Sequence, residues 1–565
     1  MAAQLSMKKP ILIKRIILTL LKGVLGITEL FFGFLLILIL YIIIVSDIDS
    51  PEVPKIEVGE RQRIGENHYV LGNNWLKKNE QGIWEMYIEG SPYERGLVYG
   101  KLAKELIQKQ EEIFVGQIDN FVPSQTWQQF LRLFLGFFNK DLPENIPLEN
   151  QQEIYGVSQA FSNKYDYIAP KYDRILNYHA AHDIGHALND YSMVGCTSFA
   201  LRDEKTEDSS LLVGRNFDFF VGDEFAEEKI ILFVNPDKGH SFASYSWAGF
   251  TGVVSGLNDK GLSVTINASK SDLPTSSKTP ISILAREILQ YAETIDEAIA
   301  IAKKRETFVS ETLLISSKKD GKAALIEKSP TKMGVFDPET SQLICSNHYQ
   351  SDTFINDEIN KENIKESDSK YRYDRVKTLL NNTTKFTPNT AVRVLRDQLD
   401  NSGDTLGMGN PRAVNQLIAH HSVIIQPEIF HFYISTQDFQ LGTFIGYNLQ
   451  DVFAKKKVDQ VSYLSSDPFL NSGAYASFKR YKLTKNKISA YVNFGKYLEL
   501  SPQDIHNFIA SNSELYITYE MLGRYFLAKK KPKSAQKYFK IALEKKLASE
   551  ATRKEIEELQ KECYQ

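Results

Sequence analysis

The sequence is poor in cysteine, and neither sign of charge is in excess. Its three cysteines, Cys196, Cys345 and Cys563, are too few for a disulfide framework in 565 residues, and an odd number leaves one thiol unpaired unless it bonds to another molecule. The 67 basic and 70 acidic residues give a formal net charge of -3, which argues against a nucleic-acid-binding protein. Glycine-rich phosphate loops followed by Lys-Ser or Lys-Thr are also absent, so nothing indicates nucleotide use.

Long apolar runs are absent except near the N-terminus. Residues 23–45 are apolar apart from Glu29, follow a basic stretch and precede two aspartates. A membrane-spanning helix needs about 20 apolar residues, and its positively charged flank stays in the cytoplasm. We therefore expect a cytoplasmic tail (1–22), an uncleaved transmembrane anchor (23–45) and export of the remainder to the periplasmic or extracellular side. A cleaved signal peptide is the alternative, although no small-residue cleavage motif follows the run.

The remainder of the chain divides into segments of different pattern. Residues 46–75 are predicted to be a linker, and residues 76–195 a mainly helical segment, helical from about Glu85. Residues 196–450 contain short β-rich runs and two groups of helices, which predicts an α+β packing of sheets with helical layers and not a doubly wound parallel sheet. Residues 451–505 are expected to be a connector.

The last segment, residues 506–565, carries a repeat-like spacing. Leu522, Gly523, Phe526, Ala535 and Phe539 fit one tetratricopeptide unit. Such repeats bury their apolar faces by stacking on neighbours, and only one unit is visible. The simpler interpretation is a helical hairpin docked on the main domain; the alternative is a cap that binds a protein partner.

The dipeptide Gly195-Cys196 stands at the start of a predicted strand. A Cys side chain there can attack the preceding carbonyl, so that the acyl group passes from nitrogen to sulfur before water releases it. The product is a Cys with a free α-amino group, which titrates near pH ~7.7 and can serve as general base for its own thiol. This arrangement activates the nucleophile without a histidine partner.

A charged pair follows on the next predicted strand. Because side chains alternate along a strand, Asn216 and Asp218 share one face. Asp218 could orient the new amine of Cys196, and Arg215 could favour the thiolate. The plain alternative is an Arg–Asp ion pair that closes a hairpin.

Several motifs in order resemble one known family. They are IEGSPYERGLVYGKL (88–102), GCTSF (195–199), GRNFDF (214–219), GLNDKGLSVTIN (256–267), CSNHY (345–349) and YRYDRVKTLL (371–380). Together these motifs are similar to the penicillin (isopenicillin N) acyltransferase-like family of N-terminal nucleophile hydrolases, which is related to choloylglycine hydrolases and acid ceramidase-like amidases. The resemblance covers residues 86–436.

The resemblance implies roles for particular residues. Cys196 resembles the nucleophile that self-cleavage after Gly195 releases. Asp218 resembles the carboxylate that contacts the new amine, and Arg215 resembles the arginine beside the thiol.

Further roles come from positions later in the chain. Asn267 matches a position that helps to form the oxyanion hole, and Asn347 matches the asparagine that orients the amine or the oxyanion. Arg372, which we prefer to Arg375, matches the arginine that completes the site. Each asparagine has a plain alternative as a turn or strand-end residue.

The resemblance also implies a fold and a reaction. The fold is a four-layer αββα N-terminal nucleophile sandwich, with residues 76–195 as pro-segment and 196–450 as catalytic domain. The reaction is attack on an amide or thioester of a small acylated substrate through a Cys196 acyl-enzyme, without metal or organic cofactor. Whether water or an amine accepts the acyl group is left open, and no residue pattern indicates a β-lactam site.

Two alternative functions, from other classes of protein, remain. His179, His182 and His186 share a predicted helix face, so a metal-dependent hydrolase can be imagined, although an HExxH pattern is absent and packing roles are simpler. His420 and His421 are expected on opposite faces of a strand, which disfavours joint ligation. The other alternative is a catalytically silent, membrane-anchored scaffold that binds partners through its C-terminal helices.

Overall fold

Alternating apolar side chains determine how the strands are layered. In β7 (Lys229–Pro236), Ile230 and Leu232 join one apolar cluster, whereas Ile231 and Phe233 join another. Because successive side chains of a strand point to opposite faces, this sheet is covered on both sides. The computed structural model describes residues 8–46, 48–121, 124–188, 195–272, 274 and 276–564.

The described residues form two β-sheets. The larger has eleven strands in the order β1-β2-β3-β4-β7-β8-β9-β10-β11-β12-β13, and the smaller has seven in the order β14-β5-β6-β15-β16-β17-β18. The larger sheet contains, besides β7, β1 (Gln62–Gly65), β2 (His68–Leu71), β3 (Asn74–Lys78), β4 (Trp84–Gly90), β8 (Phe242–Trp247), β9 (Ser255–Asn258), β10 (Leu262–Ala268), β11 (Glu311–Ser317), β12 (Lys322–Lys328) and β13 (Met333–Phe336). The smaller contains β5 (Thr197–Leu201), β6 (Leu212–Phe217), β14 (Gln342–Cys345), β15 (His421–Gln426), β16 (His431–Ser435), β17 (Phe444–Asn448) and β18 (Ser462–Leu464).

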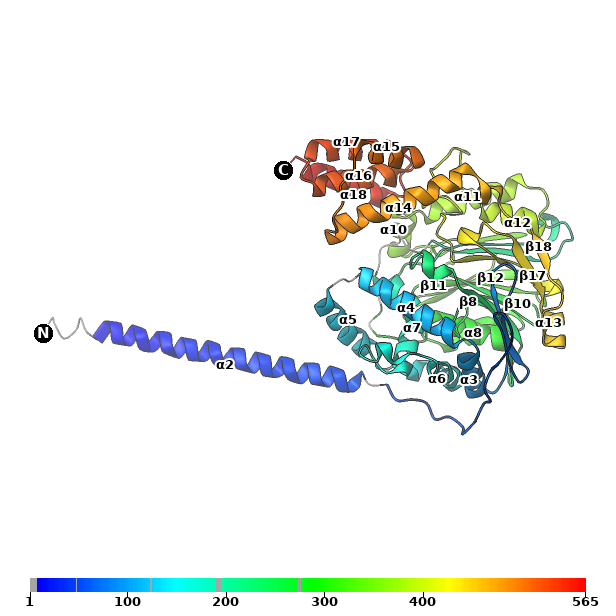
Figure 1. Ribbon diagram of the computed structural model, residues 1–565, viewed down its shortest axis with the longest axis horizontal. Helices are drawn as coiled ribbons and strands as arrows, with labels where there is room; N and C mark the ends of the chain where they lie inside the picture. The colour runs from blue at the N-terminus through cyan, green and yellow to red at the C-terminus, as the bar shows by residue number, and fades with distance from the viewer. Residues whose placement is uncertain are drawn as a thin grey trace.

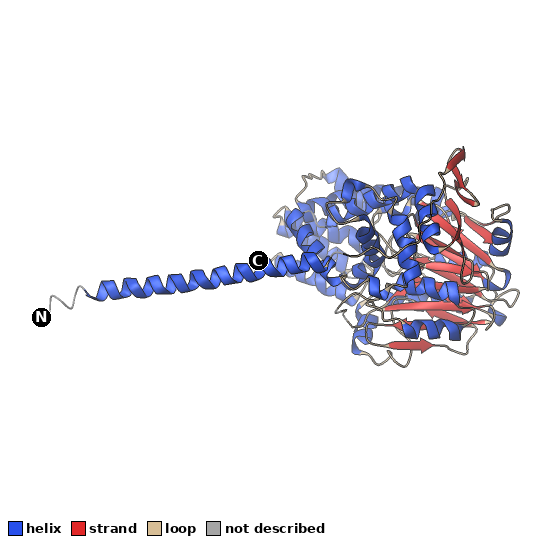
Figure 2. Ribbon diagram, turned by 90° about the horizontal axis from the view of Figure 1, so that it is seen from below, coloured by secondary structure: helices blue, strands red, loops and turns tan. Residues whose placement is uncertain are grey.

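Helices cover the outer faces of both sheets (Figure 1), and the strands lie on the side of the protein away from α2 (Figure 2). Against the larger sheet lie α3 (Pro92–Leu102), α4 (Lys104–Phe121), α6 (Leu148–Ser158), α7 (Lys171–Leu188), α8 (Ile281–Tyr291) and α9 (Ile295–Lys304). Against the smaller lie α11 (Ser369–Asn382) and α12 (Pro388–Leu395). The remaining helices are α2 (Lys8–Val45), α5 (Gln125–Phe138), α10 (Glu358–Glu366), α13 (Leu449–Lys455), α14 (Gly473–Phe494), α15 (Pro502–Ser511), α16 (Tyr516–Ala528), α17 (Pro532–Leu543) and α18 (Glu550–Glu562).

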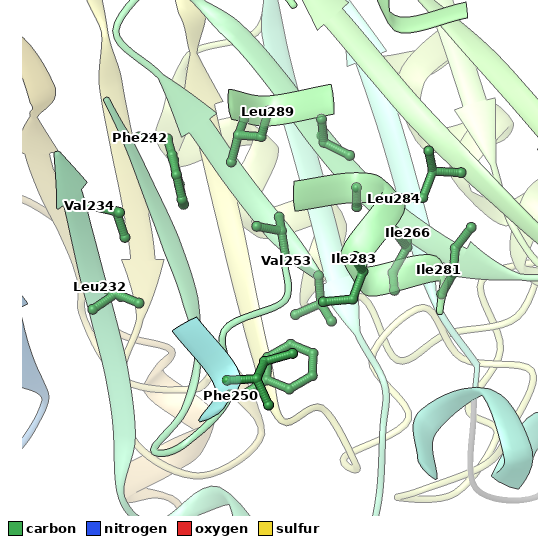
Figure 3. Close-up of a cluster of buried hydrophobic side chains, with 14 of the residues drawn as sticks. Leu232, Val234, Phe242, Phe250, Val253, Ile266, Ile281, Ile283, Leu284 and Leu289 are labelled. Carbon is green, nitrogen blue, oxygen red and sulfur yellow. The ribbon is translucent and has the colours of Figure 1, made fainter. Parts of the chain in front are cut away.

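Three apolar clusters hold these layers together. One lies between the two sheets, where Val213 and Val423 of the smaller sheet meet Phe233 of the larger. The second packs α8 on the larger sheet, with Leu284 and Ile266 among its members (Figure 3). The third joins the smaller sheet to α11 and α12. The order is therefore helices, sheet, sheet, helices.

The N-terminal part of the chain departs from the sequence prediction. Residues 46–75 were expected to be a linker, yet β1, β2 and the start of β3 lie there. The helical segment begins with α3, later than the predicted start at Glu85, because Glu85 lies in β4, which pairs in parallel with β7 from Trp84↔Ile230 to Gly90↔Pro236. Short apolar runs do not distinguish strand from helix by periodicity, and here the pairing of β4 with β7, far along the chain, determines the outcome.

The expected connector, residues 451–505, is also structured. It contains β18, which pairs with β17, and the long helix α14. Side chains of α14 share an apolar cluster with α15 to α18, so the C-terminal helices are one packed unit. Within it α16 and α17 pack closely, since a Cβ at Gly523 would lie 2.4 Å from the ring of Phe539.

Helix α2 projects from the rest of the protein (Figure 1). Within the described residues, Thr19–Val45 is the one helical stretch long and apolar enough to cross a membrane, with mean hydropathy 2.7. A helix of this composition and position is typical of either a membrane anchor or a signal sequence.

The contact of α3 with α6 generates a stability prediction. A Cβ at Gly96 would lie 2.1 Å from the main-chain oxygen of Glu153, so the two helices touch through glycine. In a Cys196→Ala background, which removes the predicted nucleophile, we expect Gly96→Ala to lower the free energy of unfolding by about 1–3 kcal/mol through overpacking, measured by urea denaturation. Gly116 of α4 has open space around it, so Gly116→Ala is the matched control and should be neutral or slightly stabilising. Equal effects of the two substitutions would contradict this packing.

Candidate active site

Strands β5 and β6 position the dipeptide Gly195-Cys196. Their antiparallel pairing sets Ser198 opposite Arg215, and the Gly195 amide extends it by donating to the Asp218 carbonyl (3.2 Å). Arg215 donates to the Cys196 sulfur at 3.7 Å. The Cys196 side chain is buried, so the thiol lies inside the protein beside a cation.

The carbonyl oxygen of Gly195 accepts two side-chain hydrogen bonds. Gln416 Nε2 donates at 2.7 Å and Arg372 Nη1 at 3.0 Å. Both lengths lie in the normal range for hydrogen bonds to a carbonyl oxygen, and both side chains are buried. The peptide bond before Cys196 is therefore polarised in the intact chain.

Sequence reasoning did not identify Gln416. It lies between α12 and β15, in a segment without a recognisable motif. The one signal is Gly195 itself: a Cβ at this position would lie 2.1 Å from Gln416 Nε2. Glycine before Cys196 thus leaves room for the donor, because a larger side chain would collide with Gln416.

Arg372 connects the carbonyl to other predicted site residues. From α11 it also donates to the Cys196 carbonyl at 2.8 Å, to Asn347 Oδ1 at 2.8 Å and to Asp368 at 2.7 Å. Arg375, the other candidate, instead pairs with Asp397 at 2.8 Å. Arg372 is therefore the arginine that lies at the site.

The two predicted asparagines hold the surrounding main chain. Asn347 Nδ2 donates to the Ala268 carbonyl at 2.8 Å. Asn267 accepts from Ser198 Oγ at 2.7 Å, and its amide donates to the Ser346 carbonyl at 3.3 Å. No hydrogen bond found among the described residues joins either asparagine to the Gly195 carbonyl.

Burial dominates the protonation of the thiol. It raises the pKa of Cys196 to about 11, and the nearby Arg215 offsets only part of that effect. The sequence suggested that Arg215 favours the thiolate, but in the intact chain desolvation is the larger influence. Cys196 is consequently a neutral thiol at neutral pH before any cleavage.

Asp218 has an unusual carboxyl group. Burial raises its pKa to about 7, although Arg372 and Arg215 act in the opposite direction. Gln416 Nε2 donates to Oδ2 at 3.3 Å, whereas Oδ1 is buried without a hydrogen-bond partner among the described residues. Asp218 can therefore exchange a proton near neutral pH.

Ser255 connects Arg215 to a pair of neighbouring histidines, His420 and His421. Ser255 Oγ accepts from Arg215 at 2.8 Å and lies 3.0 Å from His421 Nε2. The expectation that His420 and His421 point to opposite faces is wrong, because their Nδ1 atoms are 2.8 Å apart. β15 begins at His421, so strand alternation does not extend to His420. Burial lowers the pKa of both rings well below the usual value, which keeps them neutral.

The predicted histidine face on α7 is only partly described. His179 is buried and contacts Thr251 Oγ1 at 3.0 Å and the Ile175 carbonyl at 2.8 Å, as a packed core histidine would. The side chains of His182 and His186 lie outside the described residues. Among the residues that are described, no three His, Cys, Asp or Glu side chains gather as a metal site would require.

An aromatic cavity of about 40 Å³ lies between α4, α7 and the turn after β8, with Phe219 and Trp247 in its lining. Phe219 stacks on Phe217 with ring centroids 5.5 Å apart. The Phe217 ring centroid is in turn 4.2 Å from the Arg215 guanidinium. Aromatic contacts thus run from the cavity to the arginine beside the thiol.

Comparison with known sequences confirms the family resemblance. The sequence model described as "Acyl-coenzyme A:6-aminopenicillanic acid acyl-transferase" matches residues 204–406, a stretch that includes Arg215 and Arg372 and begins after Cys196. An uncharacterised protein of Archaeoglobus fulgidus is 26% identical over 279 residues, covering 45% of each chain. Protein dcd1A of Dictyostelium discoideum is 26% identical over 276 residues, covering 46% of this chain and 60% of that protein. The chain spans about half the length of the curated relatives it matches.

Solved structures of amidases are also similar over part of the chain. A Caenorhabditis elegans ortholog of N-acylethanolamine-hydrolyzing acid amidase is 17% identical with a TM-score of 0.31, covering 41% of this chain and 93% of that one. Penicillin V acylase from Agrobacterium tumefaciens is 15% identical with a TM-score of 0.31, covering 48% and 91%. A conjugated bile acid hydrolase variant from Clostridium perfringens is 13% identical with a TM-score of 0.30, covering 48% and 97%.

The pKa of Cys196 generates a prediction for the uncut chain. Only uncut protein yields the tryptic peptide of residues 175–202, so mass spectrometry can follow its alkylation separately. Because burial raises the thiol pKa to about 11, alkylation by iodoacetamide should be slow at pH 7 and still rising at pH 10. Cys563, which is partly exposed, is the internal control. A reactivity plateau below pH 8 in that peptide would mean that Arg215 outweighs burial.

Proposed function

We propose that this protein cuts itself between Gly195 and Cys196 and then uses Cys196 as the nucleophile of an amidohydrolase or acyltransferase. The observation that carries the proposal is the Gly195 carbonyl oxygen, which accepts from both Gln416 and Arg372 next to a buried thiol. The family match over residues 204–406 supports an enzyme that acts on amide bonds or transfers acyl groups.

The cleavage begins with transfer of the Gly195 acyl group. The Cys196 sulfur bonds to the Gly195 carbonyl carbon, and the negative charge that develops on the oxygen is stabilised by Gln416 and Arg372. The carbon–nitrogen bond then breaks, the nitrogen takes a proton, and a thioester remains. Water hydrolyses the thioester to give the Gly195 carboxylate and a Cys196 with a free thiol and a free α-amino group.

Asp218 is the proposed proton acceptor for the first step. A thiol with a pKa of about 11 needs a base, and a carboxyl group with a pKa of about 7 is about half ionised at neutral pH. After cleavage, the new amine of Cys196 takes over as base, and Asp218 is left to orient it. Catalysis then proceeds through a Cys196 acyl-enzyme that passes its acyl group to water or to an amine.

The proposal extends to the fold and the substrate. The order helices, sheet, sheet, helices supports an αββα N-terminal nucleophile sandwich. The close packing of α16 on α17 supports a tetratricopeptide-like hairpin. The family match over residues 204–406 supports a small acylated substrate, whose acyl group is attached through an amide or thioester.

We further propose that α2 anchors the enzyme in a membrane, with the catalytic part on the exported side. Thr19–Val45 would measure about 40 Å as a helix, enough to cross a hydrocarbon core of about 30 Å with tilt. Helix α5 approaches the end of α2, since a Cβ at Gly136 would lie 2.8 Å from Ser46 Oγ. Exposed aromatic side chains of α5, among them Trp127 and Phe130, suit the membrane–water interface.

Self-cleavage is tested by intact mass and N-terminal sequencing. We expect the purified wild-type chain to acquire a new N-terminus at Cys196 and the Cys196→Ala chain to remain whole, because alanine cannot attack the carbonyl. The processed protein, screened with acyl amides, should then release acid or transfer product. A wild-type chain that stays uncut after long incubation would favour the silent scaffold.

Membrane attachment is tested on isolated membranes. β4 belongs to the anchored segment and pairs with β7 of the catalytic segment, so high salt should leave the processed enzyme in the pellet. Urea should release the fragment that begins at Cys196 while the segment bearing α2 stays. The uncut Cys196→Ala chain is the control and should stay in the pellet under both washes. A fragment that resists urea would refute attachment through α2 alone.

A further inference from the structure

The segment that carries Gln416 is held from outside by the C-terminal helices. We define the donor loop as residues 407–417, between α12 and β15. Met408 exchanges two hydrogen bonds with the side chain of Asn512, at 3.0 and 2.8 Å. Asn512 caps the end of α15, so the loop is joined to the helical unit by a reciprocal amide contact.

Further contacts join the donor loop to the turn between α17 and α18. Asn410 is buried and donates to the Lys546 carbonyl at 2.9 Å. Arg412 donates to the Ala548 carbonyl at 3.2 Å, and its guanidinium lies 3.7 Å from the ring of Tyr371, the residue before Arg372. These contacts use main-chain carbonyls of the helical unit, which only its folded form presents at these positions.

The donor loop also contacts the C-terminal helices through its main chain. A Cβ at Gly407 would lie 2.4 Å from the main-chain nitrogen of Leu515, and its φ of +82° also favours glycine. At the other end of the loop, Leu417 is buried in the same apolar cluster as Phe478 of α14. Between these two anchored ends, Gln416 turns toward the scissile peptide bond.

We propose that Gln416 is a catalytic residue of self-cleavage, and that the C-terminal helices act as a brace that positions it. The inference rests on the proposed self-cleavage. In it, Gln416 Nε2 donates to the oxygen of Gly195 as that oxygen gains negative charge, together with Arg372. The helical unit therefore serves the active site from within the same chain, and Asn512 is a positioning residue that acts through Gln416.

The role of Gln416 is tested with a variant of similar size that lacks the donor. Gln416→Met should slow the appearance of the Cys196 N-terminus about 100- to 1000-fold, as the loss of one oxyanion donor does in other enzymes. Gln440 is the matched control, because it is also buried and donates one 2.7 Å hydrogen bond to a main-chain carbonyl, that of Leu395. Gln440→Met should process within a few-fold of the wild-type rate.

The positioning role of the C-terminal helices is tested by combining two substitutions and comparing the processing rates. Asn512→Ala should slow processing in the wild-type background and should add no further slowing to Gln416→Met, because a residue that acts through Gln416 loses its effect once the donor is gone. Asn507→Ala, at an exposed position of the same helix, is the control. Thermal unfolding of each variant separates lost structure from lost rate.

The outcomes separate this inference from the proposed function. A wild-type chain that processes while Gln416→Met processes equally fast would overturn the role of Gln416 and leave self-cleavage intact. Equal slowing by Asn512→Ala in both backgrounds would overturn the brace, because it would mark a general loss of structure. A wild-type chain that never processes would overturn self-cleavage itself and this inference with it.

Discussion

The oxygen atom of Gly195 connects parts of the chain that are far apart in sequence. Its two donors come from α11 and from the donor loop, and each donor is held by further contacts. Arg372 is fixed by Asp368 and by Asn347, so the asparagine predicted from sequence acts on the carbonyl through the arginine. A hydrogen bond in a buried site is stronger than in water, and it is costly to leave unmade. The positions of α11 and the donor loop therefore depend on each other.

Burial has opposite consequences for the two titratable groups at the site. It keeps the thiol of Cys196 protonated, and it brings the carboxyl group of Asp218 into the range where a proton can be exchanged at neutral pH. Neighbouring arginines lower both pKa values, but by less than burial raises them. The intact chain consequently holds a protonated thiol near a carboxyl group that titrates around neutral pH, a combination that composition and motif alone do not reveal.

Sequence patterns predicted those helices and strands whose conformation depends on residues nearby in the sequence. The β-rich runs and the two groups of helices in residues 196–450 were predicted because their periodicity and turns are clear. Strands β1 to β4 were missed, since their conformation follows from an edge that β7 provides more than a hundred residues later. The contact of His420 with His421 was missed because the sequence pattern placed both residues within the strand. The strand begins only at His421, so side-chain alternation does not apply to His420.

The candidate site was predictable where motifs mark it. Cys196, Arg215 and Arg372 lie together in the structure, while their catalytic roles stay predictions. Gln416 left no such mark, because a side-chain amide that donates to groups far away in the chain needs no particular neighbours in sequence. Its presence could be inferred only from the lack of a side chain at Gly195, which many other causes would explain equally well.

The parallel pairing of β4 with β7 has a consequence for assembly. Strands β1 to β4, which form one end of the larger sheet, come from the segment before Gly195, and the strands they extend come from the segment after it. If the chain is cut, the result is a heterodimer whose two subunits were made in equal numbers and folded as one molecule. Parallel pairing of distant strands is slow to form, so separately synthesised halves would have to find each other while each exposes an open edge. Synthesis of both segments as one chain removes that search.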